Sequence, residues 1–173
     1  RLWFVPSGAL QRITWGQVFA AALAKRVPLK AIRTYRRNHP NASAGEVLGR
    51  LVTDLLLRVP MNRLADARPG KTWMYEFAWR TPVGDLGAAH ALELGFVFDT
   101  LGTDEARAFA GPHAPQELAD TMHRAWVRFA KTGDPGWPQW DASRPVMTFD
   151  HPVSAVVHAP RDDERAALQR GAP

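Results

Sequence analysis

The residues best suited to chemistry lie in the stretch GDLGAAHALELGFVF, residues 84–98. Small residues surround His90 there, and Glu93 follows three positions later, at the start of an apolar run. Small residues let a loop fold tightly and bring one imidazole to a cleft, where it can act as a general base near neutral pH. A lone histidine is a weak signal, so a buried histidine with a structural hydrogen bond is the simpler interpretation from local features alone.

The other histidines carry weaker signals, because they adjoin prolines or turns or lie on a polar helix face. We interpret each as a surface residue: His39, His113, His123, His151 and His158. A metal centre needs at least three ligands at useful spacing, and the segment HALE offers two at most, so no metal site is predicted. The chain has no cysteine, which excludes disulfides and is compatible with the cytoplasm, but the localisation stays unknown.

The segment NASAG, residues 41–45, is the nearest approach to the G-x-S-x-G nucleophile elbow of hydrolases. Asn41 replaces the first glycine, and no strand precedes the segment, although the elbow requires a strand, a turn and a helix. Ser43 and Glu46 instead have the spacing of a capping box. We therefore interpret Ser43 as a helix N-cap and not as a nucleophile.

Residues 1–70 are predicted to be mainly helical. A capping-box pair, Thr14 and Gln17, opens a helix through residue 24, and a short helix follows at 32–37. The strongest helix begins after Ser43 and should kink or stop at Pro60, which lacks an amide donor, before it resumes toward residues 69–70. Its apolar stripe has helical spacing: Val47, Leu48, Leu51, Val52, Leu55, Leu56 and Val59.

Residues 71–173 are predicted to hold a strand, the histidine loop, a helix and closing strands. The strand is TWMYEFAW, residues 72–79, whose aromatic residues alternate with others. A helix from Pro115 to Gly133 follows, then two short strands, PVMTFD and VSAVVHAP, and a short helix in RDDERAALQR. This order predicts an α/β fold, in which function gathers at the carboxyl ends of strands, and His90 lies on the loop after such a strand.

Composition excludes several classes of protein. The chain has 173 residues, 46% of them hydrophobic, which suits one compact domain, and no apolar run is long enough to span a bilayer. Its net charge is +5, but the arginines are scattered except in IRTYRRNH, residues 32–39. No groove-reading motif accompanies them, so we interpret them as a solvated helix face; a nucleic-acid module would instead show salt-sensitive binding.

Several segments together resemble the type-B carboxylesterases, the cholinesterase-like branch of the α/β-hydrolases. LGAAHALELGFVFDTLG resembles the family's histidine segment, and WVRFAKTGDPGWPQW is similar to a later signature. WMYEFAW looks like the strand before the histidine loop, and TDLLLRVPMNRLA, with Asp54 and Pro60, resembles the preceding helix. The matches occur in family order and cover nearly the whole chain.

The resemblance implies the C-terminal part of an α/β-hydrolase that is incomplete without its upstream part. Such enzymes hydrolyse carboxylic esters by Ser-His-Glu acyl transfer without a cofactor, and the family's catalytic histidine corresponds to His90. Glu93 matches a glutamate that we interpret as supporting the histidine rather than as the triad acid, and we expect it to be buried and hydrogen-bonded. Ala91 stands where many members have glycine, and Gly95 where many have proline.

The nucleophile, the triad acid and the oxyanion-hole motif have no counterpart in this chain, and RLWFVPSG resembles the segment after the family's acid-bearing loop. We therefore expect these groups upstream in the same polypeptide. The 173-residue chain alone should be inactive and prone to associate, because WMYEFAW should be an interior strand of a larger sheet. The alternative function is a non-enzymatic, cholinesterase-like interaction domain, which an upstream G-x-S-x-G segment would argue against.

Overall fold

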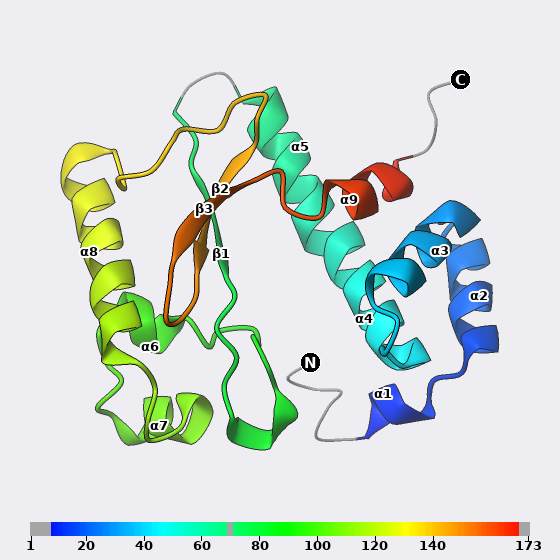
Figure 1. The fold of residues 1–173 in the computed structure, drawn as a ribbon, viewed down its shortest axis with the longest axis horizontal. Coiled ribbons are helices and arrows are strands. Elements are labelled where there is room, and N and C mark those ends of the chain that lie inside the picture. Colours follow the sequence, from blue (N-terminus) through cyan, green and yellow to red (C-terminus); the bar gives the residue numbers. More distant parts are fainter. Residues whose placement is uncertain (1–7, 69–70, 170–173) are drawn as a thin grey trace. The chain divides into compact units, whose positions relative to one another are not determined.

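The computed structural model describes residues 8–68 and 71–169, which form two compact units (Figure 1). The sheet unit consists of residues 71–160. The helical unit consists of residues 8–68 and 161–169. Most of the segment RLWFVPSG, residues 1–7, and the predicted helix end at residues 69–70 lie outside the described residues.

The helical unit contains the elements predicted for the first part of the chain and one helix from the other end. Both predicted capping boxes are confirmed: Thr14 with Gln17, and Ser43 with Glu46. Each box satisfies backbone donors that a helix start leaves without partners. The elements are α1 (Ala9–Arg12), α2 (Trp15–Ala24), α3 (Leu29–Asn38), α4 (Ala44–Thr53), the π-helical turn η1 (Asp54–Arg58), α5 (Val59–Ala67) and α9 (Asp162–Leu168).

Pro60 changes the type of the long helix instead of ending it. The helix passes from α4 through the π turn η1 into α5, and the Val59 N–H donates to the carbonyl of Asp54, five residues back. Pro60 has no N–H to donate and its ring clashes with the carbonyl four residues before it, so a wider turn just upstream accommodates it. Of the two predicted outcomes, a kink or a stop, the helix does not stop: the π turn disturbs it just before Pro60, and it resumes as predicted.

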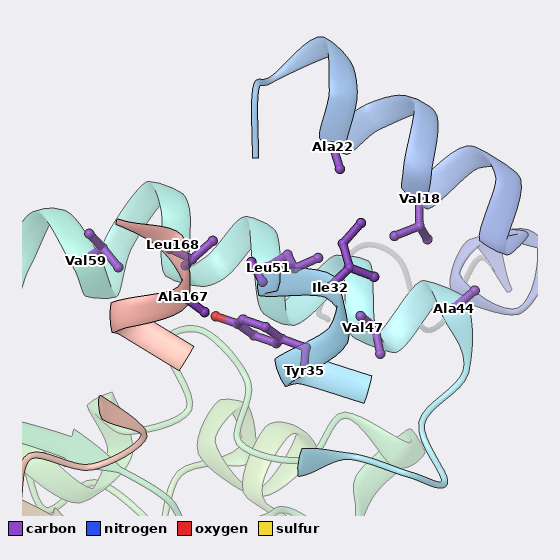
Figure 2. Close-up of a cluster of buried hydrophobic side chains, with 11 residues drawn as sticks. Val18, Ala22, Ile32, Tyr35, Ala44, Val47, Leu51, Val59, Ala167 and Leu168 are labelled. Carbon is purple, nitrogen blue, oxygen red and sulfur yellow. The ribbon is translucent and has the colours of Figure 1, made fainter. Parts of the chain in front are cut away.

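The core of the helical unit is an apolar cluster between α2, α3, α4 and α9 (Figure 2). Part of the predicted stripe lies in it, since Val47, Leu51 and Val59 are buried, whereas Leu56 is 69% exposed. Gly45 is required where α1 meets α4, because a Cβ atom there would lie 2.0 Å from the carbonyl oxygen of Leu10. The glycine of NASAG thus has a packing role.

A buried network of polar side chains closes the helical unit. Tyr35 donates its hydroxyl hydrogen to Asp54, and Arg58 binds the same carboxylate, with its Nε 2.8 Å from Asp54 Oδ1. Arg58 Nη2 also lies 3.2 Å from Oε2 of Glu164, which comes from α9. Glu164 is 2% exposed, and its Oε1 accepts a 2.9 Å hydrogen bond from Nε2 of His39. The network ties α9 to α3 and to the π turn.

The sheet unit holds three strands, in the order β1 (Met74–Phe77), β2 (Pro145–Phe149) and β3 (Ala155–His158). The first pair is parallel and the second antiparallel. All three predicted strands are confirmed, each with shorter bounds than predicted. Within the described residues β1 is paired along one edge only. The remaining elements are the 3₁₀ turn η2 (Val83–Asp85), α6 (Leu94–Val97), α7 (Asp104–Ala110) and α8 (Gln116–Thr132).

The predicted aromatic face of β1 packs on helices α8 and α6. Tyr75 meets Trp126 edge-on at 6.0 Å, and Phe77 lies 5.1 Å from Phe96, between ring centroids. Such aromatic pairs add to the stabilisation from buried apolar area. The alternation in the sequence therefore fixes which side of the strand faces the helices.

We predict that Glu164→Ala destabilises the helical unit by about 1.5–3 kcal/mol, because the half-buried His39 loses its acidic partner and Arg58 keeps only one of its two carboxylate partners, Asp54. The measurement is urea unfolding of the full-length polypeptide, with amide hydrogen exchange in α3 and α9. The matched control is Asp163→Ala, whose carboxylate is 48% exposed and should cost less than about 1 kcal/mol. Equal losses from the two variants would contradict the prediction.

Candidate active site

A compact loop carries the chain from β1 to His90. Its neck is closed by an isolated bridge between Thr81 and Gly87, in which the Thr81 N–H donates to the Gly87 carbonyl at 3.3 Å. The Thr81 hydroxyl donates to the carbonyl of Phe109, 2.9 Å away. Gly84 and Gly87 both have positive φ, which glycine adopts without steric cost. The small residues of the segment therefore serve tight turns, as the sequence indicates.

His90 is exposed on a turn whose neighbours are buried. Ala89 and Leu92 are 7% and 2% exposed, and the Leu92 N–H donates to the Ala89 carbonyl at 3.3 Å. The imidazole makes no hydrogen bond within the part of the chain that the structure describes. The interpretation of His90 as a buried, hydrogen-bonded structural histidine is therefore wrong. The backbone on both sides is anchored, and the ring is available.

Helix α6 follows this turn and is held by side chains from α8. His123 donates its Nδ1–H to the carbonyl of Val97 at 2.9 Å, and Gln116 donates to the carboxylate of Asp99 at 2.7 Å. His123 is half-buried, so its interpretation as a surface residue is wrong. One feature of the sequence could have predicted this burial. His123 follows Ala119 by four residues, so the two share a face of α8, and Ala119 is buried.

Glu93 is half-buried, and its carboxylate makes no hydrogen bond to any described residue. The expectation that it would be buried and hydrogen-bonded is therefore wrong. Its backbone carbonyl accepts hydrogen bonds from the N–H groups of Phe96 and Val97 at the start of α6. Burial raises the pKa of Tyr75, and the nearby negative charge of Glu93 raises this pKa further. The Glu93 charge is thus close enough to Tyr75 to act on its hydroxyl group.

A hollow of about 230 Å³ lies beside the histidine turn, between α6 and α7. Ala91 and Gly95 line it together with apolar side chains such as Phe98 and Phe109. Gly95 also permits close packing, because a Cβ atom there would lie 3.2 Å from Leu101 Cδ2. A bulkier residue at this position requires Leu101 to shift.

Ser143, His158 and Asp141 lie close together near the sheet, but the directions of their hydrogen bonds do not fit a catalytic triad. Ser143 donates its hydroxyl hydrogen to Asp141 at 2.6 Å, and this bond, the largest cause, lowers the pKa of Asp141. Nδ1 of His158 lies 3.1 Å from the Ser143 oxygen and must donate to it, because the serine proton is already engaged. An activated serine instead donates to the imidazole.

The remaining histidine of note, His39, is half-buried against Glu164 and not a surface residue. Among residues 8–68 and 71–169, no three His, Cys, Asp or Glu side chains come together as a metal site. The same residues contain no helix that is long and apolar enough to cross a membrane.

The fold corresponds to part of an α/β-hydrolase. The carboxylesterase EST55 of Geobacillus stearothermophilus, in its structure at pH 6.2, superimposes with a TM-score of 0.82 and 32% sequence identity over 97% of this chain and 38% of its own. A sequence profile described as the carboxylesterase family matches residues 12–165. The chain belongs to the carboxylesterase family.

Curated relatives are similar to this chain over a short part of their length. It is 33% identical over 128 residues to the para-nitrobenzyl esterase of Bacillus subtilis (strain 168), which covers 68% of this chain. It is 31% identical over 134 residues to the phenmedipham hydrolase of Pseudarthrobacter oxydans, which covers 72% of this chain. In both cases the chain spans 26% of the relative.

We predict that Ala91→Gly stabilises the protein by about 0.5–1 kcal/mol. Ala91 has φ of 65°, in the left-handed region, where a Cβ atom costs more than the flexibility that glycine adds to the unfolded chain. The neighbouring Ala88→Gly is the control. Ala88 lacks a positive φ, so the same change should destabilise by about 0.5–1 kcal/mol. Urea unfolding of the full-length variants measures both, and shifts of the same sign would contradict this account.

Proposed function

We propose that this chain is part of a serine carboxylesterase that hydrolyses carboxylic esters by Ser-His-Glu acyl transfer, with His90 as the general base. The observation that carries the proposal is the exposed imidazole of His90 on a turn anchored by buried Ala89 and Leu92, beyond the carboxyl end of β1. Membership of the carboxylesterase family supports the reaction class, as do relatives named as esterases.

The reaction needs a neutral imidazole whose backbone is held in place and whose ring nitrogen can accept a proton. His90 would take the proton of the attacking serine and return it to the leaving alcohol, while a carboxylate holds the imidazolium. In this proposal the serine, the triad glutamate and the oxyanion hole come from the rest of the same polypeptide. In this proposal the substrate is a small-molecule ester, and the reaction uses protein side chains and water without a cofactor.

Glu93 acts in this proposal as a support for the histidine turn and not as the triad acid. Its backbone carbonyl accepts the first hydrogen bonds of α6, and its negative charge acts on Tyr75 of β1. A triad carboxylate is expected to accept a hydrogen bond from the histidine ring, and no described hydrogen bond joins Glu93 to His90.

We predict that His90→Ala lowers the turnover of a p-nitrophenyl ester by the full-length polypeptide about 10⁴-fold or more, because the proton shuttle is lost. The variant should fold normally, since the His90 side chain is exposed. His113→Ala, which removes another exposed imidazole of the sheet unit, is the matched control and should retain wild-type turnover. Wild-type turnover by the His90 variant would overturn the assignment.

For Glu93→Gln we expect two effects of different size. Loss of the negative charge should lower the pKa of Tyr75, although burial, the larger cause, keeps it above the ordinary value. Ester turnover should fall by less than about tenfold, far less than for removal of a triad member. Tyrosine ¹³C resonances followed against pH report the first effect, and steady-state kinetics the second. A loss of turnover equal to that of His90→Ala would make Glu93 the triad acid.

A further inference from the structure

A basic groove lies on the surface of the helical unit, whereas the residues assigned to ester hydrolysis belong to the sheet unit. Its volume is about 510 Å³. It is lined by one indole, three guanidinium groups, one imidazole and two small apolar residues: Trp15, Arg33, Arg36, Arg37, His39, Pro40 and Ala42. The three arginines come from α3, and Trp15 is the first residue of α2. This volume is in the range of sites that hold small molecules.

Part of the positive charge in the groove is already neutralised. Arg37 lies 3.1 Å from the carboxylate of Asp163, and His39 is bonded to Glu164. Arg33 and Arg36, by contrast, form no ion pair with any carboxylate among the described residues. Two exposed guanidinium groups one helical turn apart therefore line the groove with positive charge that no described carboxylate neutralises.

The indole of Trp15 fixes the orientation of Arg36. The guanidinium carbon lies 4.6 Å from the centroid of the ring, in cation–π contact, and Trp15 is half-buried. This contact uses none of the N–H donors of Arg36, and no described residue accepts a hydrogen bond from its guanidinium, so these N–H groups are available. A guanidinium held in this way is preorganised for bidentate hydrogen bonding to an oxyanion.

The surrounding charge favours an anion as well. Residues 8–68 contain eleven Arg and Lys against three Asp and Glu, whereas residues 71–160 contain seven against eleven. The positive charge of the chain is thus concentrated in the segment that builds the groove. Such an excess attracts anions over several ångströms, while the contact residues decide which anion stays.

We propose that this groove binds a small molecule through an oxyanion group, a phosphate or a carboxylate. Arg33 and Arg36 are the main donors, and Trp15 is the platform that orients Arg36. A solvated helix face, the interpretation that the sequence alone suggests for these arginines, requires neither the stacked indole nor the hollow beside it. The residues of this site differ from those assigned to the ester chemistry, which belong to the sheet unit.

The test is isothermal titration calorimetry of the full-length polypeptide with inorganic pyrophosphate and, separately, with citrate, at about 0.15 M NaCl. We expect saturable binding, and Arg33→Gln or Arg36→Gln should each weaken it by about tenfold or more, through loss of charge-assisted hydrogen bonds. Arg36→Lys keeps the charge but loses the planar fork, and it should also bind more weakly. Tighter binding of pyrophosphate assigns the site to phosphates, and tighter binding of citrate to carboxylates.

The matched control is Arg63→Gln, which removes one exposed arginine of α5 in the same unit and should change the affinity less than about twofold. Circular dichroism verifies that each variant is folded. If Arg63→Gln weakened anion binding as much as Arg33→Gln or Arg36→Gln, the binding would come from the overall positive charge of the unit and not from a specific site. That result, or no saturable binding of either anion at about 1 mM, overturns the proposal. Ester turnover by the same variants is a separate measurement, so loss of this site does not bear on the role of His90.

Discussion

The helical unit depends on keeping one buried carboxylate, that of Glu164, in contact with positive charge. A buried ion without partners costs several kcal/mol, so the elements that supply its partners have to remain together. Arg58 from the π turn and His39 from the end of α3 both reach Glu164. Apolar packing brings these helices together, and the charged contacts fix their register.

The same network explains two further features. Burial, the largest single cause, lowers the pKa of Arg58, but Asp54, Tyr35 and Glu164 together raise it above its ordinary value, so Arg58 stays positively charged. Burial and the hydrogen bond to Asp54 raise the pKa of Tyr35 above its ordinary value. The contribution of the neutral Tyr35 hydroxyl to stability is therefore complete below the ordinary tyrosine pKa of about 10 and decreases as the pH rises above it. The π turn forced by Pro60 contains both Asp54 and Arg58.

Local rules of sequence predicted much of this fold but little of its long-range polar pairing. The capping boxes at Thr14 and Ser43, the aromatic strand and the closing strands all follow from residue types at short spacing. The contacts of Glu164 and His123 join segments far apart in the chain, and no local pattern encodes them. For the site, the sequence indicated the tight turns around His90. The exposure of the His90 ring, and the fact that the Glu93 carboxylate has no hydrogen-bond partner among the described residues, depend on how α6 packs.

The order of elements along the chain has a consequence for synthesis on the ribosome. The helical unit is interrupted by the whole sheet unit, and Glu164 follows its partner Arg58 by 106 residues. At translation rates of about 5–20 residues per second, Arg58 emerges roughly 5–20 s before the carboxylate that completes its pairing. During that interval the contacts of α9 with α3 and with the π turn cannot form. A nascent chain arrested before α9 would expose the part of the apolar cluster that Ala167 and Leu168 complete, and this surface could bind chaperones.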